Sequence, residues 1–344
     1  MARRRRGDTE VAARRKGRTR RSRPPADWPA GGGPNRRRGA SPVTGRVVTL
    51  TPALRRAATR RRRQKRARIT AAVPAPVQRP AADFHLAACV ACARIGGRVI
   101  MDYWGRRGSF KVQEKGRRDY VTIVDREAEA AIVRLVRERF PDHAILAEES
   151  APTEGTVGYR WYIDPLDGTT NYIHGYPLFA VSIAVSDPQG MRAAAVYDPV
   201  RNEMFTAARG AGAFLNGEPL RVSSVETLAQ SLLVTGIPFR SLGRLDEYIA
   251  SFRAFVLGAG GIRRDGSAAL DLAYVAAGRL DGFWEMSLSP WDVAAGSLIV
   301  REAGGIVTDF QGRAGYLESG DIIAANPKIQ ADMLRIVREC YRRA

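Results

Sequence analysis

Two aspartates three positions apart, Asp164 and Asp167, are the residues of this sequence best suited to chemistry. They end a short apolar run within residues 161–171, where Pro165 cannot donate to a strand ladder and Gly168 permits a tight turn. We therefore predict a strand that breaks into a turn and a helix, with two carboxylates beside the N–H groups of the helix N-terminus. Carboxylates bind hard cations such as Mg²⁺ and free N–H groups bind phosphate, so this segment could hold both. The alternative is a polar turn with an N-cap and no chemistry.

Four further acids fall at the ends of predicted elements: Asp125, Glu148, Glu149 and Asp292. Each alone has a structural explanation, since an aspartate at a helix start is usually an N-cap and glutamates at a strand end can be solvated surface. Adjacent residues on a strand point to opposite faces, so one of the two glutamates is expected to face inward. Six such acids near a phosphate-suited helix end would repel one another unless cations held them together. Together they predict a metal site.

Helices and strands must bring these acids together, because they lie far apart in the chain. Apolar periodicity predicts helices over residues 84–103, 126–140, 245–257, 268–277, 290–303 and 329–341. It predicts strands over 143–147, 161–164, 178–186, 191–197, 203–207, 212–215, 231–238, 281–286, 306–309 and 322–325. Asn216-Gly217 is expected to form a hairpin turn. Alternating elements without an internal repeat predict a mixed α/β fold in layers.

The net charge of +20 and the pI of 10.7 suggest a nucleic-acid binder until the charge is located. Residues 1–80 contain 25 Lys and Arg residues and 3 acids, which is +22, whereas residues 81–344 carry 30 basic and 32 acidic side chains, which is −2. The basic character therefore belongs to residues 1–80, and the rest of the chain is nearly neutral.

Residues 1–80 combine arginine runs with many prolines, a composition that cannot bury enough apolar surface to offset the entropy of ordering. We expect an Arg-rich, disordered N-terminal extension. Its role is open among a nucleic-acid tail that binds by counterion release, an organelle-targeting peptide, a solvated extension without a role, and an assigned start that lies too far upstream. The scarcity of aromatic residues for base stacking favours the last two.

The three cysteines, Cys89, Cys92 and Cys340, are too few for a disulfide framework, so a reducing, cytoplasmic location is expected. His85, Cys89 and Cys92 share one helical face, but a zinc site needs four ligands, and two small buried thiols are the favoured interpretation. We find no apolar run of the ~18–20 residues that a membrane span needs, and no apolar region of a secretory signal.

Three segments resemble the signature motifs of the inositol monophosphatase family: Glu148-Glu-Ser, Asp164-Pro-Leu-Asp-Gly-Thr-Thr-Asn171 and Trp291-Asp-Val-Ala-Ala-Gly296. Their order and spacing make the resemblance specific, and it covers residues 84–341. One departure is Ala147, where the family frequently has glycine. The resemblance implies a five-layered αβαβα sandwich of the inositol monophosphatase and fructose-1,6-bisphosphatase type for residues 81–344. It also implies a homodimer and Mg²⁺-dependent, lithium-sensitive hydrolysis of a phosphate monoester.

The resemblance implies a role for each site residue. The metal ligands for two or three Mg²⁺ ions would be Glu148, Asp164, Asp167, Asp292 and the backbone carbonyl of Leu166. The catalytic residues would be Asp125 and Thr169, which activate the attacking water, and Glu149. The substrate-binding residues would be Gly168 and Thr169 at the phosphate and Gly266, Ser267, Ala268 and Glu285 in the pocket wall. Two Mg²⁺ ions suit this reaction, because they would neutralise the phosphate dianion, activate a water and stabilise the leaving alkoxide.

The expected substrate is inositol 1-phosphate or a similar sugar or polyol phosphate. Histidinol phosphate, fructose bisphosphate and a nucleotide 3′-phosphate are alternatives, because only the pocket residues would choose among them. Binding is a second class of function. Some bacterial members of the family also serve transcription antitermination and ribosomal RNA maturation as protein partners, and the basic tail could contact RNA or a transcription complex.

Overall fold

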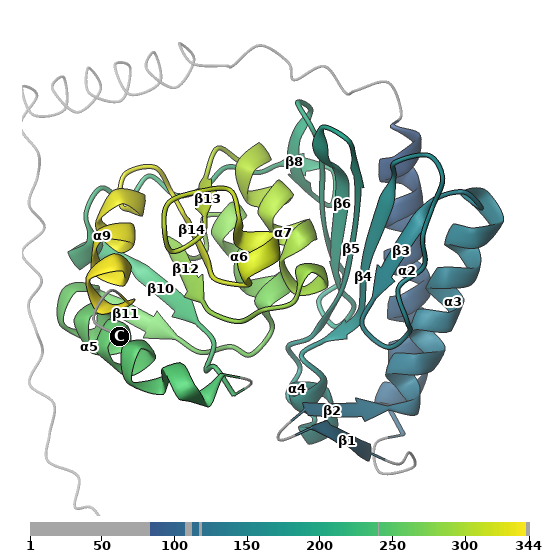
Figure 1. Ribbon diagram of the computed structural model, residues 1–344, viewed down its shortest axis with the longest axis horizontal. Helices are drawn as coiled ribbons and strands as arrows, with labels where there is room; N and C mark the ends of the chain where they lie inside the picture. Colours follow the sequence, from purple (N-terminus) through teal and green to yellow (C-terminus); the bar gives the residue numbers. More distant parts are fainter. Residues whose placement is uncertain (1–82, 107–111, 117–118, 240, 342–344) are drawn as a thin grey trace, which may run out of the picture. The chain divides into compact units, whose positions relative to one another are not determined.

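The computed structural model describes residues 83–106, 112–116, 119–239 and 241–341 (Figure 1). Contacts between Cα atoms divide the chain into two compact units, Met1–Ala75 and Pro76–Ala344. Every described residue belongs to the second unit, and the predicted N-terminal extension lies outside the described residues.

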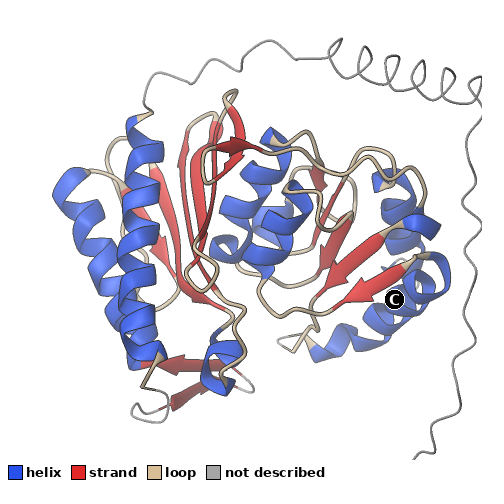
Figure 2. Ribbon diagram, turned by 180° about the vertical axis from the view of Figure 1, so that it is seen from behind, coloured by secondary structure: helices blue, strands red, loops and turns tan. Residues whose placement is uncertain are grey.

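Two large β-sheets and three layers of helices make up the described part of the chain (Figures 1 and 2). Helices α2 (Phe84–Trp104) and α3 (Ile123–Arg139) cover one face of the larger sheet. Helices α6 (Ala268–Ala276) and α7 (Pro290–Glu302) lie between the sheets, and α5 (Leu245–Gly258) and α9 (Gln330–Tyr341) cover the far face of the smaller one. The order is αβαβα, so the predicted layered fold is confirmed.

The larger sheet has seven strands in the order β3-β4-β5-β6-β7-β8-β9. Their bounds are β3 (Ala144–Ala147), β4 (Arg160–Asp167), β5 (Ala180–Asp187), β6 (Gly190–Asp198), β7 (Glu203–Ala208), β8 (Gly212–Leu215) and β9 (Glu218–Pro219). Strands β3 and β4 are parallel and the other neighbours are antiparallel. On β5, Val181 and Ile183 pack with α2 and α3, whereas Ala180 and Ala184 join the core around α6 and α7. Because both faces are covered, the strand is apolar at successive positions.

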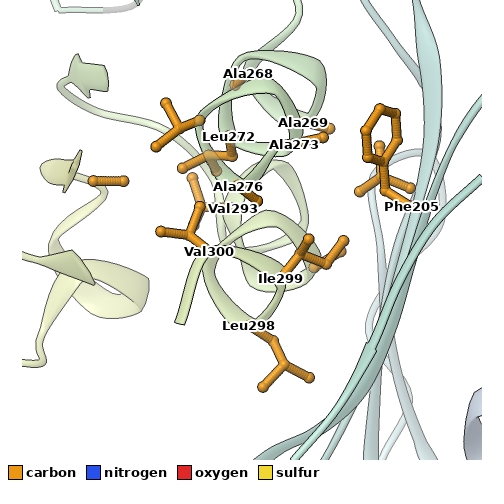
Figure 3. Close-up of a cluster of buried hydrophobic side chains, with 14 of the residues drawn as sticks. Phe205, Ala268, Ala269, Leu272, Ala273, Ala276, Val293, Leu298, Ile299 and Val300 are labelled. Atoms are coloured by element: carbon orange, nitrogen blue, oxygen red, sulfur yellow. The ribbon is translucent and has the colours of Figure 1, made fainter. Parts of the chain in front are cut away.

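The middle helices pack closely on each other, and their apolar side chains gather between the two sheets (Figure 3). Gly296 on α7 allows the approach, because a Cβ atom there would lie 2.5 Å from Cβ of Leu272 on α6. Helix α7 begins with Pro290 after the cap Ser289. Its N-terminus therefore has a fixed start, and Asp292 lies in its first turn.

The smaller sheet has five strands in the order β11-β10-β12-β14-β13. Their bounds are β10 (Leu232–Thr235), β11 (Gly261–Arg263), β12 (Gly282–Glu285), β13 (Ile306–Thr308) and β14 (Ile322–Ala325). Strand β10 is parallel to β11 and β12, so the loops that follow these three strands leave the same edge of the sheet. A separate antiparallel hairpin pairs β1 (Val112–Gly116) with β2 (Asp119–Thr122), and two short helices, α4 (Thr169–His174) and α8 (Tyr316–Ser319), complete the fold.

Three local predictions need correction. Helix α3 starts at Ile123 with Thr122 as its N-cap, so Asp125 is the third helical residue and not the cap. The hairpin β1–β2 and the short strand β11 are absent from the predicted elements. Helix α2 passes a length and composition test for a membrane span, contrary to the prediction that no segment would. It packs against α3, β5 and β6, and core helices of folded domains pass the same test.

Candidate active site

The turn after β4 has the predicted form. Pairing with β5 shifts between Asp164 and Asp167, so the strand is irregular where its two aspartates lie. Gly168 follows with φ 90° and is the N-cap residue of α4. This backbone conformation favours glycine, and a Cβ there would also lie 3.1 Å from the carbonyl oxygen of Leu178.

Asn171 fixes this turn from the side. Its Nδ2 atom donates to the carbonyl oxygens of Leu178 at 2.8 Å and Asp265 at 2.9 Å. The amide therefore ties the start of α4 to the loop before α6, almost a hundred residues away. The sequence showed Asn171 only as a helix-start residue, because its partners come from distant segments.

A cavity of about 470 Å³ lies at the end of β4. It is lined by most of the predicted site residues: Glu148, Asp164, Leu166, Asp167, Gly168, Thr169, Gly266, Ser267, Ala268, Glu285 and Asp292. They come from both sheets and from the N-termini of α4, α6 and α7. His174 also lines it.

Glu149 differs from these residues. It is not among the residues that line the cavity, and its backbone N–H donates to Oε2 of Glu129 on α3 at 2.7 Å. Glu148 is the member of the glutamate pair that lines the cavity, and both glutamates lie in the bend just after β3 ends at Ala147.

Hydrogen bonds orient three of the cavity carboxylates. Asp167 Oδ2 accepts from Ser267 Oγ at 2.6 Å and from the N–H of Ala269 at 2.8 Å. Asp164 Oδ1 accepts from the N–H of Leu166 at 3.0 Å. Asp292 Oδ2 accepts from the N–H of Ser289 at 2.8 Å, which closes a capping box at the start of α7. One oxygen of each carboxylate is thus held by the protein, and the direction of the other is set.

The carboxylates also repel one another. Burial raises the pKa of Asp164 well above its usual value, and the negative charges of Glu148, Asp167 and Asp292 raise it further. Loss of contact with water and the charge of Asp292 raise the pKa of Asp167 to about 7. The hydrogen bond from Ser267 opposes this shift. A positive charge in the cavity would relieve both effects.

These donors fit a hard divalent cation, because all of them are carboxylate or carbonyl oxygens. Among the described residues, however, no three Asp, Glu, His or Cys side chains already converge as a preformed metal centre. The cavity therefore suits a cation through the chemistry of its oxygen donors and through the repulsion among its carboxylates.

Asp125 and Thr169 meet directly, as the resemblance implies. Thr169 Oγ1 lies 3.1 Å from Asp125 Oδ1 and 3.0 Å from the carbonyl oxygen of Leu166. Asp125 is fully buried, and its Oδ2 accepts from Oγ1 and N–H of Thr122 at 2.6 and 2.8 Å. Burial raises the pKa of Asp125, and the bonds from Thr122 and Thr169 oppose that shift.

Other cavity residues were not predicted. Tyr120 comes from β2, residues 236–239 follow β10, Arg264 follows β11 and residues 286–288 follow β12. None of them carries a charge pattern or motif typical of a site, except that Arg264 borders the predicted pocket wall. Only the parallel order of β10, β11 and β12 brings their following loops to one place.

A family model described as the inositol monophosphatase family matches residues 82–342. The chain belongs to this family. The match leaves out residues 1–81, so the family resemblance and the Arg-rich extension occupy different parts of the chain.

Similar proteins agree with this assignment. The chain is 51% identical over 251 residues to the Nus factor SuhB of Pseudomonas aeruginosa, covering 72% of this chain and 93% of that protein. It is 49% identical over 251 residues to the Nus factor SuhB of Escherichia coli, covering 73% and 94%. Among solved structures, an inositol monophosphatase from Anabaena is 39% identical, with a TM-score of 0.67 and coverage of 74% and 95%. The extragenic suppressor protein SuhB from Bartonella henselae is 43% identical, with a TM-score of 0.71 and coverage of 73% and 97%.

Proposed function

We propose that this protein is a Mg²⁺-dependent phosphomonoesterase that hydrolyses inositol 1-phosphate or a similar sugar or polyol phosphate. One observation carries the proposal: four carboxylates, one after β3, two on β4 and one on α7, line one cavity beside the contact between the buried Asp125 and Thr169. In this proposal Glu148, Asp164, Asp167, Asp292 and the carbonyl of Leu166 hold two or three Mg²⁺ ions. Bound Mg²⁺ would neutralise the phosphate dianion, lower the pKa of the attacking water and stabilise the leaving alkoxide.

The remaining residues orient the reactants. Thr169 has one hydroxyl proton, which it donates in a hydrogen bond to Asp125, so its oxygen can accept a hydrogen bond from the attacking water. As the water loses a proton to the Thr169 oxygen, the hydroxyl proton of Thr169 passes to Asp125, whose pKa burial keeps above that of an exposed aspartate. The N–H groups of Gly168 and Thr169 bind the phosphate, and Glu285 accepts from a hydroxyl of the alcohol. Glu149 stays a proposed catalytic residue, because it adjoins Glu148, and like Asp125 it is not among the residues that line the cavity.

Replacement of Asp164 tests the proposal. Asp164→Asn keeps the shape of the side chain but removes the charge of the most buried cavity acid. We expect Mg²⁺-dependent phosphate release to fall by at least about 100-fold, and Mg²⁺ binding measured by calorimetry to weaken. Asp142→Asn, at an exposed aspartate, is the matched control. Full activity of Asp164→Asn, or no Mg²⁺-dependent release from any phosphomonoester by the unaltered chain, would contradict the proposal.

The choice of substrate within this class is also part of the proposal. A panel of inositol 1-phosphate, histidinol phosphate, fructose bisphosphate and a nucleotide 3′-phosphate compares the alternatives directly. We also propose, from the family, inhibition by Li⁺, a homodimer and a cytoplasmic location. Phosphate release in the presence of Li⁺, the mass of the protein in solution and cell fractionation check these three properties.

A second function, in transcription, is favoured by relatives that are named Nus factors at about half identity. We propose that this chain also binds a transcription complex or its RNA. The full chain and a variant that begins at Ala81 are compared for RNA binding at several salt concentrations. If residues 1–80 bind single-stranded RNA, the affinity falls as salt rises, by roughly 0.7 logarithmic units per phosphate contact for each tenfold increase, and truncation removes the effect. Binding that is absent, or unchanged by truncation and salt, excludes a role of the extension.

A further inference from the structure

Helix α3 buries two of its four acidic residues, Asp125 and Glu129. They lie four positions apart, so both side chains leave the same face of the helix, about 6 Å apart along its axis. Asp125 contacts Thr169. Glu129 is only 4% exposed and has no part in the proposed hydrolysis. Because removing a carboxyl group from water costs free energy, an apolar side chain would suit this position better if it served packing alone.

Glu129 holds the backbone that carries Glu148. Its Oε2 atom accepts from the N–H of Glu149 at 2.7 Å. The N–H of Glu148 itself donates to the carbonyl oxygen of Ile163 on β4 at 3.2 Å, directly before Asp164. The two peptide units that flank the Cα atom of Glu148 are thus tied to neighbouring elements, one to α3 and one to β4. Since peptide units are planar, these two bonds restrict φ and ψ of Glu148 and set the direction in which its side chain leaves the backbone.

The segment that carries Glu148 depends on such support. Strand β3 ends at Ala147, and residues 148–150 form a bend outside any strand or helix. Glu148 is the residue of this bend that lines the cavity and is a proposed Mg²⁺ ligand. Groups that orient metal ligands from behind commonly change metal affinity or activity by about 10–100-fold when they are replaced. A contact that fixes the bend is therefore expected to affect the binding of the cation.

We propose that Glu129 is a positioning residue for Mg²⁺ binding: it holds the N–H of Glu149 so that the carboxylate of Glu148 stays directed to the cavity. Glu129 is not among the residues that line the cavity, so it acts through the bend and not on the cation itself. With Asp125 one turn earlier, a single face of α3 then supports both the activation of water and one metal ligand. This inference rests on the proposed phosphomonoesterase function and adds a residue that sets its affinity for Mg²⁺.

Three replacements of Glu129 separate its hydrogen bond from its charge. Glu129→Ala removes the acceptor, Glu129→Asp keeps the charge on a side chain one methylene shorter, and Glu129→Gln keeps an oxygen acceptor at the same length. We expect Glu129→Ala and Glu129→Asp to raise the Kd for Mg²⁺, measured by calorimetry, by about 10–100-fold. Glu129→Gln should stay within about threefold of the unaltered chain, because it keeps the hydrogen bond. Glu138→Ala, at an exposed acid of the same helix, is the matched control and should leave the Kd unchanged.

The Mg²⁺ dependence of hydrolysis gives a second measurement, with glycerol 2-phosphate as a small polyol phosphate. In Glu129→Asp the Mg²⁺ concentration for half-maximal rate should rise by the same factor as the Kd. Excess Mg²⁺ should compensate, so kcat at saturating Mg²⁺ and substrate should fall by less than about threefold. The rise in the thermal unfolding midpoint that a fixed Mg²⁺ concentration produces should also be smaller in this variant, because weaker binding stabilises the folded chain less.

The outcomes separate the two proposals. An unchanged Kd in Glu129→Asp excludes the positioning role, even if the variant unfolds at a lower temperature without Mg²⁺, because the residue would then support only the fold. A rise of the Kd in Glu129→Gln as large as in Glu129→Asp also excludes it. The phosphatase proposal stands in both cases if the unaltered chain releases phosphate with Mg²⁺. If Glu129→Ala does not fold, the comparison of Glu129→Asp with Glu129→Gln decides. If the unaltered chain neither binds Mg²⁺ nor hydrolyses any phosphomonoester, both proposals fail.

Discussion

Thr169 has two acceptors for one hydroxyl proton, Asp125 Oδ1 and the carbonyl of Leu166. If Leu166 ligates a cation, the proton goes to Asp125, and the water loses its orienting acceptor when the hydroxyl is removed. We expect Thr169→Ala to lower kcat at least about 100-fold, in the range of an acid–base contribution. One lost hydrogen bond should cost only about 1 kcal/mol of the free energy of unfolding. Phosphate release and denaturant unfolding measure the two effects separately.

Thr156→Ala is a suitable control, because Thr156 is exposed in the loop after β3 and lies outside the cavity. It should change neither quantity. A Thr169→Ala variant with nearly full kcat would show that Thr169 serves only to hold the turn.

At the residue scale, the acids could be predicted because six of them fall at the ends of predicted elements, although each alone has an ordinary structural explanation. Phe239 and Asn171 could not be assigned their positions in the same way. A phenylalanine after a strand looks like any core residue, and the partners of an asparagine side chain lie on segments that only the fold brings near. Of the two adjacent glutamates, Glu148 lines the cavity and Glu149 does not, which the sequence could not decide.

Helix α2 lies close to the larger sheet because two of its residues have no side chain. A Cβ atom at Gly97 would lie 2.6 Å from the ring of Tyr197 on β6, and one at Gly96 would lie 3.2 Å from Cγ1 of Val181 on β5. We expect Gly97→Ala to reduce the free energy of unfolding by about 1–3 kcal/mol, as overpacking does. Gly105→Ala, at the end of the same helix with φ −73° and no atom within 4 Å of a Cβ, should be neutral or stabilising by about 0.5 kcal/mol. Equal effects of the two changes in denaturant unfolding would contradict this packing.

A cluster of aromatic rings joins the start of α2 to β3 and β4. The ring of His143 stacks on Tyr159 at 4.6 Å and His85 stacks on Tyr159 at 4.9 Å. Trp161 Nε1 donates to His143 Nδ1 at 3.1 Å, so this nitrogen of His143 is an unprotonated acceptor. Burial lowers the pKa of both histidines below the usual value of 6.5, and the charge of His85 lowers the pKa of His143 further.

The lowered pKa values give stability a defined pH dependence. In the unfolded chain both histidines take up a proton near pH 6.5, whereas the folded chain resists protonation. The stability of the neutral cluster is therefore complete above about pH 6.5 and is lost as the pH falls below that value. Asp83 and Asp187 oppose the shift at His85, and Arg192 and burial favour it.

His85→Phe should reduce this loss, because it keeps a ring against Tyr159 and removes one titrating group. Free energies of unfolding at pH 7.5 and 5.5 measure it, and we expect a smaller difference in the variant than in the unaltered chain. The same loss in both chains would mean that other groups cause the acid sensitivity.

At the element scale, long amphipathic helices and alternating strands were predictable, and α5, α7 and α9 end within one residue of their expected limits. Asn216 and Gly217 both have positive φ, as the predicted hairpin turn requires. The three-residue β11 was missed because a strand of that length has too few positions to show a period, and it exists through its pairing with β10. The N-cap of α3 is Thr122 and not the predicted Asp125. Threonine and aspartate both suit an N-cap, so the sequence alone could not choose between them.

For the whole chain, the layered fold could be predicted from apolar periodicity, but the order of the strands in its sheets depends on pairing between distant segments that no single segment encodes.

The net positive charge and the candidate active site lie in different parts of the sequence. Every residue proposed for catalysis lies in the unit Pro76–Ala344, whereas residues 1–80 hold the net positive charge. The intact mass of the native protein would show whether the extension is part of it.

A variant that begins at Ala81 should therefore be a complete enzyme. The electrostatic field of residues 1–80 reaches only about 10 Å at 0.1 M salt, so at that ionic strength it should leave the cavity carboxylates and the encounter with substrate unaffected. We expect kcat/KM for glycerol 2-phosphate and the midpoint of thermal unfolding to match those of the full chain. At about 0.01 M salt, where screening extends to roughly 30 Å, a positive extension would attract the phosphate dianion and raise kcat/KM of the full chain alone. A loss of more than about tenfold on truncation at 0.1 M salt would instead mean that the extension completes the site, because a screened field cannot produce that effect.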